Sequence, residues 1–294
     1  PSGGFPGRDG ARRFCFPGSS LAQWVPGDQA NQRRNLNVAV MSDTLVINEI
    51  YASLQGESTW AGLPCVFVRL TGCNLRCSYC DTAYAFSEGR RMTLAEIRAE
   101  ILRLAQPYRA ASASVRAPGP PASQVALPLV ELTGGEPLLQ PNSLPLMKSL
   151  CDQGFTVLLE TSGACDISGV DARVHRIMDL KCPSSGEAEH NRWENLGCLK
   201  STDEIKFVIG TREDYEWCKE QLAARQLHRV CPVLVSWVQP LSPAQQHRAL
   251  KPAPPGQTPL SRRELAERVI ADALPVRLQV QLHKIVWSAD QRGV

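Results

Sequence analysis

Polar and apolar side chains alternate along several short segments of the chain. In residues 64–71, one face of an extended chain would carry Cys65, Phe67, Arg69 and Thr71, and the other face would carry only valine and leucine. Successive side chains of a β-strand point to opposite faces, so this segment is expected to be a strand with one mixed and one apolar face. The same split recurs at residues 130–133, 178–181, 204–207 and 277–283.

Helix signals separate these strands. Capping boxes stand at Thr93-x-x-Glu96 and Ser261-x-x-Glu264, and each predicts the start of a helix. The pattern predicts strands at 64–71, 127–133, 155–161, 174–181, 204–209, 229–237 and 276–283. It predicts helices after residue 93 and at 143–152, 212–225 and 262–274. Alternating strands and helices indicate an α/β fold of mostly parallel strands with outer helices.

The shared polar side of the strands predicts where a site would lie. If the apolar faces meet helices, the polar faces enclose a common interior, as in a partial TIM-like (β/α) barrel that holds ligand. An antiparallel sheet with one solvated face would show the same alternation, but the intervening helices favour the barrel. A charge that faces an interior must be paired or bound to ligand. Five such side chains are candidate site residues: Arg69, Asp179, Lys181, Lys206 and His283.

Composition narrows the class of protein. The 294 residues are 43% hydrophobic, which is enough for a sizeable core. A net charge of +3 without a block of like charges gives no reason to expect a nucleic-acid partner. No run approaches the roughly 20 apolar residues of a membrane span, so no membrane association is expected. The 11 cysteines show no disulfide-like pairing in their spacing and predict a reducing compartment, the cytoplasm.

The first 40 residues differ from the rest of the chain. Residues 1–40 are rich in Gly, Pro, Ser and Arg and lack periodicity, which predicts a disordered N-terminal extension or a tag. An organelle-targeting leader is the alternative. Residues 41–294 are expected to form one domain, with insertions at about 106–124 and 240–260 that are rich in Pro and Ala.

Three cysteines follow the strand predicted at 64–71. Cys73, Cys77 and Cys80 lie within eight residues, and the next cysteine is Cys151. An iron–sulfur cube normally takes four cysteine ligands, so three predict a cluster with one iron open to a small molecule. A zinc site is the alternative, but it would need a fourth Cys or His ligand, and none stands at suitable spacing.

The spacing CxxxCxxC resembles the cluster loop of radical S-adenosylmethionine (SAM) enzymes. From about residue 45 to the C-terminus, further motifs resemble the 7-carboxy-7-deazaguanine synthase family. They are QGE (55–57), CNLRCSYCDT (73–82), TGGEPLLQ (133–140), ETSG (160–163), DLKCPSSG (179–186), DEIKFVI (203–209) and LHKIVW (282–287).

The resemblance implies a fold, a reaction and partners. The fold would be the partial barrel of radical SAM enzymes. The activity would be that of a carbon–nitrogen lyase in queuosine and 7-deazapurine biosynthesis. It would convert 6-carboxy-5,6,7,8-tetrahydropterin to 7-carboxy-7-deazaguanine by a radical ring contraction that releases ammonia. A 4Fe–4S cluster, SAM, Mg²⁺, an electron donor of flavodoxin or ferredoxin type and a homodimer are implied with it.

The resemblance also assigns roles to single residues. Cys73, Cys77 and Cys80 would hold the cluster, and Thr82 would bind Mg²⁺. Contacts to SAM would come from Tyr79, Asp81, Gly135, Glu136, Ser184, Gln239 and Pro240, with Gly134 in the same turn as Gly135. Contacts to the pterin would come from Leu54, Gln55, Gly56, Arg69, Thr133, Glu160 and His283. Within this set, Arg69 would bind the substrate carboxylate and Glu160 the aminopyrimidine edge.

Two alternative functions share the cysteine loop. A glycyl-radical-enzyme activating protein has the same spacing but must admit a protein loop as its substrate, and the QGE and LHKIVW motifs argue against it. A non-catalytic zinc-binding protein would use the cysteines for structure alone. Iron and sulfide content distinguishes the second alternative from a radical SAM enzyme.

Overall fold

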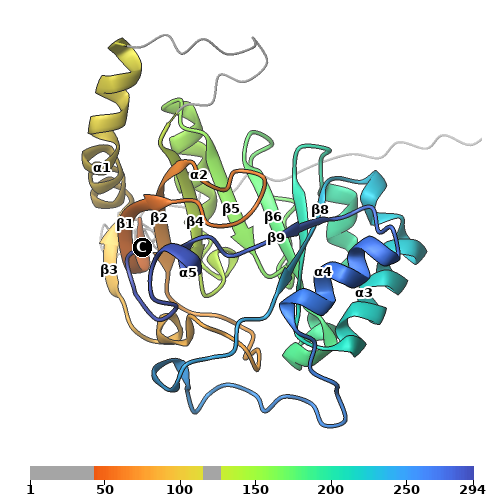
Figure 1. Cartoon of the computed structure of the whole chain (residues 1–294). Coiled ribbons are helices and arrows are strands. Elements are labelled where there is room, and N and C mark those ends of the chain that lie inside the picture. Colours follow the sequence, from red (N-terminus) through yellow and green to blue (C-terminus); the bar gives the residue numbers. More distant parts are fainter. Residues whose placement is uncertain (1–42, 115–126) are drawn as a thin grey trace, which may run out of the picture. The chain divides into compact units, whose positions relative to one another are not determined.

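One nine-stranded sheet forms the centre of the computed structural model, which describes residues 43–114 and 127–294 (Figure 1). Its strand order is β3-β1-β2-β4-β5-β6-β7-β8-β9. Neighbours from β2 to β9 are parallel, whereas β1 is antiparallel to both β2 and β3. The strands are β1 (Thr44–Leu54), β2 (Pro64–Leu70), β3 (Arg90–Thr93), β4 (Leu129–Gly134), β5 (Val157–Thr161), β6 (His175–Leu180), β7 (Glu204–Ile209), β8 (Val233–Trp237) and β9 (Arg277–Gln279).

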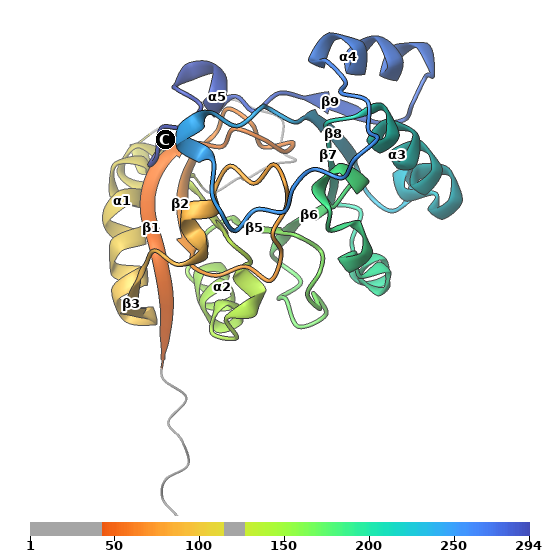
Figure 2. The same ribbon diagram turned by 90° about the horizontal axis from the view of Figure 1, so that it is seen from below.

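Helices cover the outer side of this curved sheet (Figure 2). They are α1 (Leu94–Ser114), α2 (Ser143–Asp152), α3 (Arg212–Arg225) and α4 (Arg262–Ala271). The short α5 (His283–Val286) follows β9 and is not part of this outer layer. Both predicted capping boxes are confirmed: Glu96 N–H donates to Thr93 Oγ1 and Glu264 N–H to Ser261 Oγ, each at 3.2 Å. The described part of the chain contains no helix long and apolar enough to cross a membrane.

The two faces of the strands separate as the alternation predicts. Val66, Val68 and Leu70 are fully buried in the main apolar core, which the side chains of α1 to α4 complete. Cys65 and Phe67, from the other face of β2, belong to a separate inner cluster with residues of β4, β5 and β6. The mostly parallel partial barrel is thus confirmed, and the solvated antiparallel sheet is wrong.

Two parts of the strand prediction need correction. Strands β1 and β3 were not expected, and they add an antiparallel edge. The strand expected at 276–283 ends at Gln279, and His283 instead begins α5. Leu278 and Val280 are 40% and 44% exposed at this edge of the sheet.

Both predicted insertions contain ordered structure. Helix α1 continues through Pro107 to Ser114, and the ring lies on the exposed side, where the carbonyl that it leaves without a partner is accessible to water. Residues 240–260 pack onto the barrel: Leu260 is 3% exposed and donates its N–H to the Gly210 carbonyl at 3.0 Å. The expectations for residues 1–40 and 115–124 lie outside the described residues.

Candidate active site

A cavity of about 250 Å³ lies on the inner side of the sheet, at the end where the parallel strands finish. Cys73, Cys77 and Cys80 line it from the loop after β2, and no other cysteine of the described residues does. Burial raises the pKa of Cys77 to about 12, so this thiol would stay protonated until a metal displaces its proton. Three thiols on one cavity fit a cluster that keeps one iron for a further ligand.

The glycine turn after β4 supports the start of this cysteine loop. Gly135 N–H donates to the Leu70 carbonyl at 3.1 Å, and Glu136 N–H donates to the Gly72 carbonyl at 2.7 Å. A Cβ atom on Gly135 would overlap the Gly72 carbonyl oxygen, so only glycine allows this approach. The missing Cβ therefore serves the packing of the two loops against each other.

The Glu136 side chain lies behind the cavity wall. It is fully buried and accepts hydrogen bonds from Ser162 N–H at 2.8 Å, Ser162 Oγ at 2.7 Å and Thr161 Oγ1 at 2.9 Å. Thr161 and Ser162 line the cavity, whereas Glu136 does not. Glu136 would thus act on a bound molecule indirectly, by holding Thr161 and Ser162.

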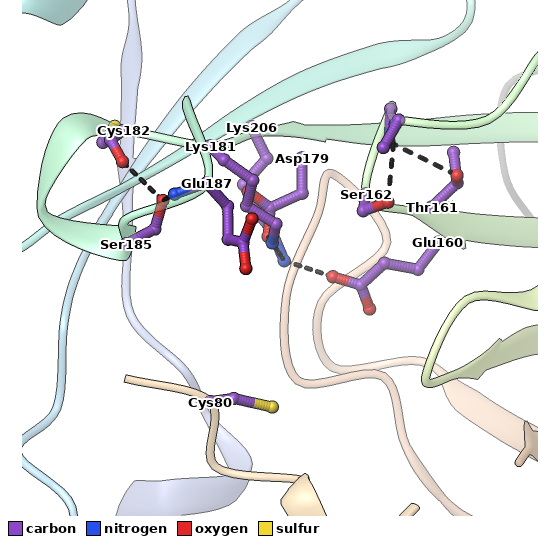
Figure 3. A network of polar contacts seen from close by, with 12 residues as sticks. Cys80, Glu160, Thr161, Ser162, Asp179, Lys181, Cys182, Ser185, Glu187 and Lys206 are labelled. Carbon is purple, nitrogen blue, oxygen red and sulfur yellow. Dashed lines mark hydrogen bonds and ion pairs between the residues drawn. The ribbon is translucent and has the colours of Figure 1, made fainter. Parts of the chain in front are cut away.

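A buried ammonium group gathers carboxylates at the centre of the inner face (Figure 3). Lys206 Nζ contacts Glu57 at 3.0 Å, Asp179 at 3.6 Å and Glu160 closely. Lys181 pairs with Asp179 at 3.0 Å. Burial raises the pKa of Glu57, but the attraction of Lys206 and His283 and the hydrogen bonds from Gln281 and Lys206 together outweigh it and hold this pKa at about 2.

Glu131 lies beside this network without a cation of its own. It is 1% exposed and accepts a hydrogen bond from the Gln55 side-chain amide. Burial, with the nearby charge of Glu160, raises the Glu131 pKa well above its ordinary value. The inner face thus places a protonatable acid next to fixed charges.

Arg69 and aromatic residues form another wall. Arg69 Nε donates to Glu49 at 2.8 Å and its Nη2 to the Tyr51 hydroxyl at 2.9 Å. A guanidinium has five N–H donors, so donors remain for a ligand. Tyr84 also donates to Glu49, at 3.0 Å, which fixes the carboxylate that orients Arg69.

The C-terminal segment closes the cavity next to the residues that follow β1. Leu282 N–H donates to the Gly56 carbonyl at 2.8 Å, and a Cβ atom on Gly56 would overlap the His283 ring. Burial lowers the pKa of His283, which favours a neutral imidazole. Lys284 pairs with Asp81 of the cysteine loop, so this segment also reaches the cluster side.

Most predicted site residues line the one cavity. They are Leu54, Gln55, Gly56, Arg69, Cys73, Cys77, Tyr79, Cys80, Asp81, Thr82, Thr133, Gly134, Gly135, Glu160, Asp179, Lys181, Lys206, Gln239 and His283. Glu136, Ser184 and Pro240 do not line it. The Ser184 hydroxyl instead donates to Asp214 at 2.5 Å, behind the wall.

Other lining residues were not proposed from the sequence. Glu57, Glu131, Tyr51 and Lys284 belong to this group. Strand alternation could have identified Glu131, which shares the polar face of its strand with Thr133. Tyr51 lies on β1, a strand that was not expected, so no alternation pointed to it.

Comparisons with known proteins agree with this geometry. Residues 67–184 match the family model of the radical SAM superfamily. The chain is 43% identical to the 7-carboxy-7-deazaguanine synthase of Koribacter versatilis over 84% of this chain and 99% of that one. It is 40% identical to the protein of the same name from Chlorobaculum tepidum, over 85% and 97%. Its fold resembles the crystal structure of QueE from Escherichia coli, with a TM-score of 0.58 and 23% identity over 82% of this chain and 95% of that one.

Proposed function

The chain belongs to the 7-carboxy-7-deazaguanine synthase family of radical SAM enzymes, and from this membership we propose its reaction. It is a radical SAM enzyme of 7-deazapurine biosynthesis. The proposed substrate is 6-carboxy-5,6,7,8-tetrahydropterin, which the enzyme contracts to 7-carboxy-7-deazaguanine with release of ammonia. The observation that carries the proposal is that the three cysteines, Arg69 and Glu160 line the same cavity.

The radical SAM family implies a 4Fe–4S cluster and SAM, and the residues present fit both. When bound, they supply a one-electron cleavage of SAM that yields a carbon radical. Cys73, Cys77 and Cys80 would hold the cluster. The proposed SAM contacts are Tyr79, Asp81, Gly135 and Gln239 on the cavity wall, Glu136 and Ser184 behind it, and Pro240 next to Gln239. Glu136 would act by holding Ser162, and Ser184 by its bond to Asp214.

Charged groups on the inner face suit a pterin carboxylate and its aminopyrimidine ring. Arg69 would bind the carboxylate with the donors that Glu49 and Tyr51 leave available. Glu160 would accept hydrogen bonds from the amino and ring N–H groups, and its ion pair with Lys206 holds the carboxylate in place on the inner face. Leu54, Gln55, Gly56, Thr133 and His283 would surround the ring.

Magnesium is a further part of the proposal. Thr82 Oγ1 lines the cavity 3.7 Å from Cys80 Sγ, next to the position of the cluster. Among residues 43–114 and 127–294, no three His, Cys, Asp or Glu side chains converge to hold one ion. The other Mg²⁺ ligands would accordingly be substrate oxygens and water, which Mg²⁺ commonly retains. Replacing Thr82 by Val should abolish any stimulation of turnover by added Mg²⁺.

Partners and location complete the proposal. We expect a cytoplasmic enzyme that receives electrons from a flavodoxin or ferredoxin and forms a homodimer. Exposed apolar side chains at Leu278, Val280, Ile285 and Val286 are candidates for the dimer contact. Light scattering of the purified protein distinguishes a dimer from a monomer.

Anaerobic turnover tests the reaction. Reconstituted protein with SAM, dithionite and 6-carboxytetrahydropterin should release 7-carboxy-7-deazaguanine and ammonia without any partner protein. Product detection by mass spectrometry supports the proposal. A requirement for a protein substrate would indicate a glycyl-radical activating enzyme, and a colourless protein with stoichiometric zinc would contradict the radical mechanism. The relatives do not favour either alternative.

A variant pair sharpens this test. Arg69→Ala should retain slow SAM cleavage without substrate but raise KM for the pterin by about 100-fold, because a charge-assisted pair is lost. Arg103→Ala is the matched control, since its side chain is 65% exposed on α1 and, within residues 43–114 and 127–294, forms an ion pair only with its helical neighbour Glu100. An unchanged KM in Arg69→Ala would remove Arg69 from the substrate site.

A further inference from the structure

The segment 240–260 contacts the cysteine loop directly. Lys251 N–H donates to the Arg76 carbonyl at 2.9 Å, and Arg76 immediately precedes Cys77. Lys251 Nζ also donates to the Gly186 carbonyl at 2.8 Å and pairs with Glu187 at 3.1 Å. The lysine therefore joins two loops that lie far apart in the sequence.

Glu187 also binds the backbone of Arg76. Its Oε1 accepts the Arg76 backbone N–H at 2.6 Å, while Oε2 contacts Lys251 at 3.1 Å and His190 at 2.8 Å. Its side chain is only 3% exposed. Both backbone polar groups of Arg76 are thus held, the N–H by a buried carboxylate and the carbonyl by the 240–260 segment.

Neighbouring bonds extend this attachment. Ser78 donates its N–H to the Ser185 carbonyl at 3.0 Å and its Oγ to the Ser184 carbonyl at 2.6 Å. The Ser185 hydroxyl in turn accepts from Glu187 N–H at 3.0 Å. Figure 3 shows Ser185 and Glu187 on the segment across from Cys80. The residues on both sides of Cys77 are therefore fixed from the side away from the cavity.

We propose that Glu187 and Lys251 form a clamp on Arg76 that positions Cys77 for cluster binding and keeps the cluster loop in its SAM-binding geometry. Both are positioning residues, because they act through Arg76 and do not line the cavity. Groups behind metal ligands orient the ligands, and their loss commonly weakens metal binding. The clamp assigns a role to Lys251 of the 240–260 segment. It depends on the cluster of the proposed function and not on the pterin.

The two arms of the clamp are unequal. Glu187 is buried and accepts from three donors, so its loss leaves the Arg76 N–H unpaired in the interior. The Lys251 side chain is 41% exposed, and its ion pair is weakened by solvent. Its backbone bond to Arg76 survives any side-chain substitution. Glu187 should therefore have the larger effect.

Iron release from reconstituted enzyme tests the clamp. Glu187→Gln should lose iron to a chelator about 10-fold faster than the wild type. The EPR spectrum of its reduced cluster should also change less on addition of SAM. Asp203→Asn is the matched control: Asp203 is fully buried, pairs with Arg176 at 3.2 Å and Lys200 at 3.0 Å, and lies just before β7 at the opposite end of the strands. This control should lower thermal stability but leave both cluster readouts unchanged.

Lys251 variants keep the test decisive if Glu187→Gln folds poorly. Lys251→Met should release iron about 2-fold to 3-fold faster, and Lys251→Arg should restore the wild-type rate, because the cation returns. Iron release and EPR responses equal to the wild type in Glu187→Gln or, where that variant folds poorly, in Lys251→Met would overturn the clamp. Product formation plays no part in these readouts, so an enzyme that holds its cluster but fails to convert the pterin contradicts only the substrate assignment.

Discussion

The outer and inner faces of the sheet are stabilised in different ways. Phe207 points outward from β7 and is fully buried among apolar side chains of the main core. Lys206, the preceding residue, points inward, is 3% exposed and contacts three carboxylates. One strand therefore contributes to an apolar core and to a charged cavity at consecutive positions.

This difference separates stability from function. Apolar burial on the outer face stabilises the fold without directional requirements. Paired charges on the inner face contribute less to stability, because desolvation offsets their attraction. They do fix hydrogen-bonding groups around a cavity that a polar ligand can enter. Substitutions on the outer face should accordingly lower mainly the free energy of unfolding, and substitutions on the inner face should change mainly the catalytic parameters.

The largest effect is expected at a cluster ligand. Cys77→Ala should abolish the iron absorbance and all SAM cleavage, because two thiols remain where the cluster needs three. Cys218→Ala is the matched control, since this cysteine is buried in the outer core on α3. It should keep both signals at a modest cost in stability. Iron and sulfide assays with anaerobic turnover measure the contrast, and a Cys77→Ala enzyme that still cleaves SAM would exclude Cys77 as a ligand.

The next largest effect is on the outer face. Phe207→Ala should lower the free energy of unfolding by about 3–5 kcal/mol, because it removes a ring from a packed core and leaves a cavity. The fraction that remains folded should keep its KM for the pterin. Denaturant unfolding and steady-state kinetics check the two statements. A large change in KM would show that the two faces are not independent.

On the inner face, the substitution to compare with Phe207→Ala is Lys206→Met. It should reduce turnover strongly while costing about 2 kcal/mol of stability, less than the loss of a fully buried partner, since the Glu160 side chain is 26% exposed. In the wild type the Glu57 pKa of about 2 lies below its ordinary 4.5, so its stabilisation is present above pH 4.5 and is lost as the pH falls towards 2.

That acid dependence provides a second measurement for the same variant. Without Lys206 the Glu57 pKa should rise, and the loss of stability between pH 4.5 and 2 should become shallower. Lys148→Met is a suitable control, because its side chain is 63% exposed and its pair with Asp152 lies on α2. If stability falls between pH 4.5 and 2 as steeply in Lys206→Met as in the wild type, another group holds Glu57 ionised.

Local sequence patterns predicted what local geometry determines. Alternation placed Arg69, Asp179 and Lys206 on the inner face, because the direction of a strand side chain depends only on parity. The capping boxes at Thr93 and Ser261 fixed two helix starts for the same reason: both hydrogen-bond partners lie within four residues.

Long-range contacts could not be predicted in this way. His283 does line the cavity, but it does so from a helix that begins where Leu282 bonds to Gly56, more than 200 residues earlier. Lys206 contacts Glu57 across 149 residues of sequence, so no local pattern shows which carboxylates neutralise it. The conformation of residues 240–260 likewise depends on hydrogen bonds to distant residues such as Arg76 and Gly210.

The protonation of Glu131 gives the finest test of the inner face. Its pKa is raised by burial, so between pH 4.5 and that pKa the folded protein holds a proton that the unfolded chain has released. Stability from this group is therefore complete below pH 4.5 and is lost as the pH rises, at no more than about 1.4 kcal/mol per pH unit. Glu131→Gln resembles the protonated acid and can still accept the Gln55 amide.

The variant should thus match the wild type near pH 4.5 and become more stable than it as the pH increases towards 8. Thermal unfolding across this range measures the difference. Glu264→Gln is the control, because Glu264 lies at the exposed start of α4 and should show no such gain. If Glu131→Gln is less stable than the wild type throughout, Glu131 is ionised in the folded protein, and the inner face must supply it with a cation.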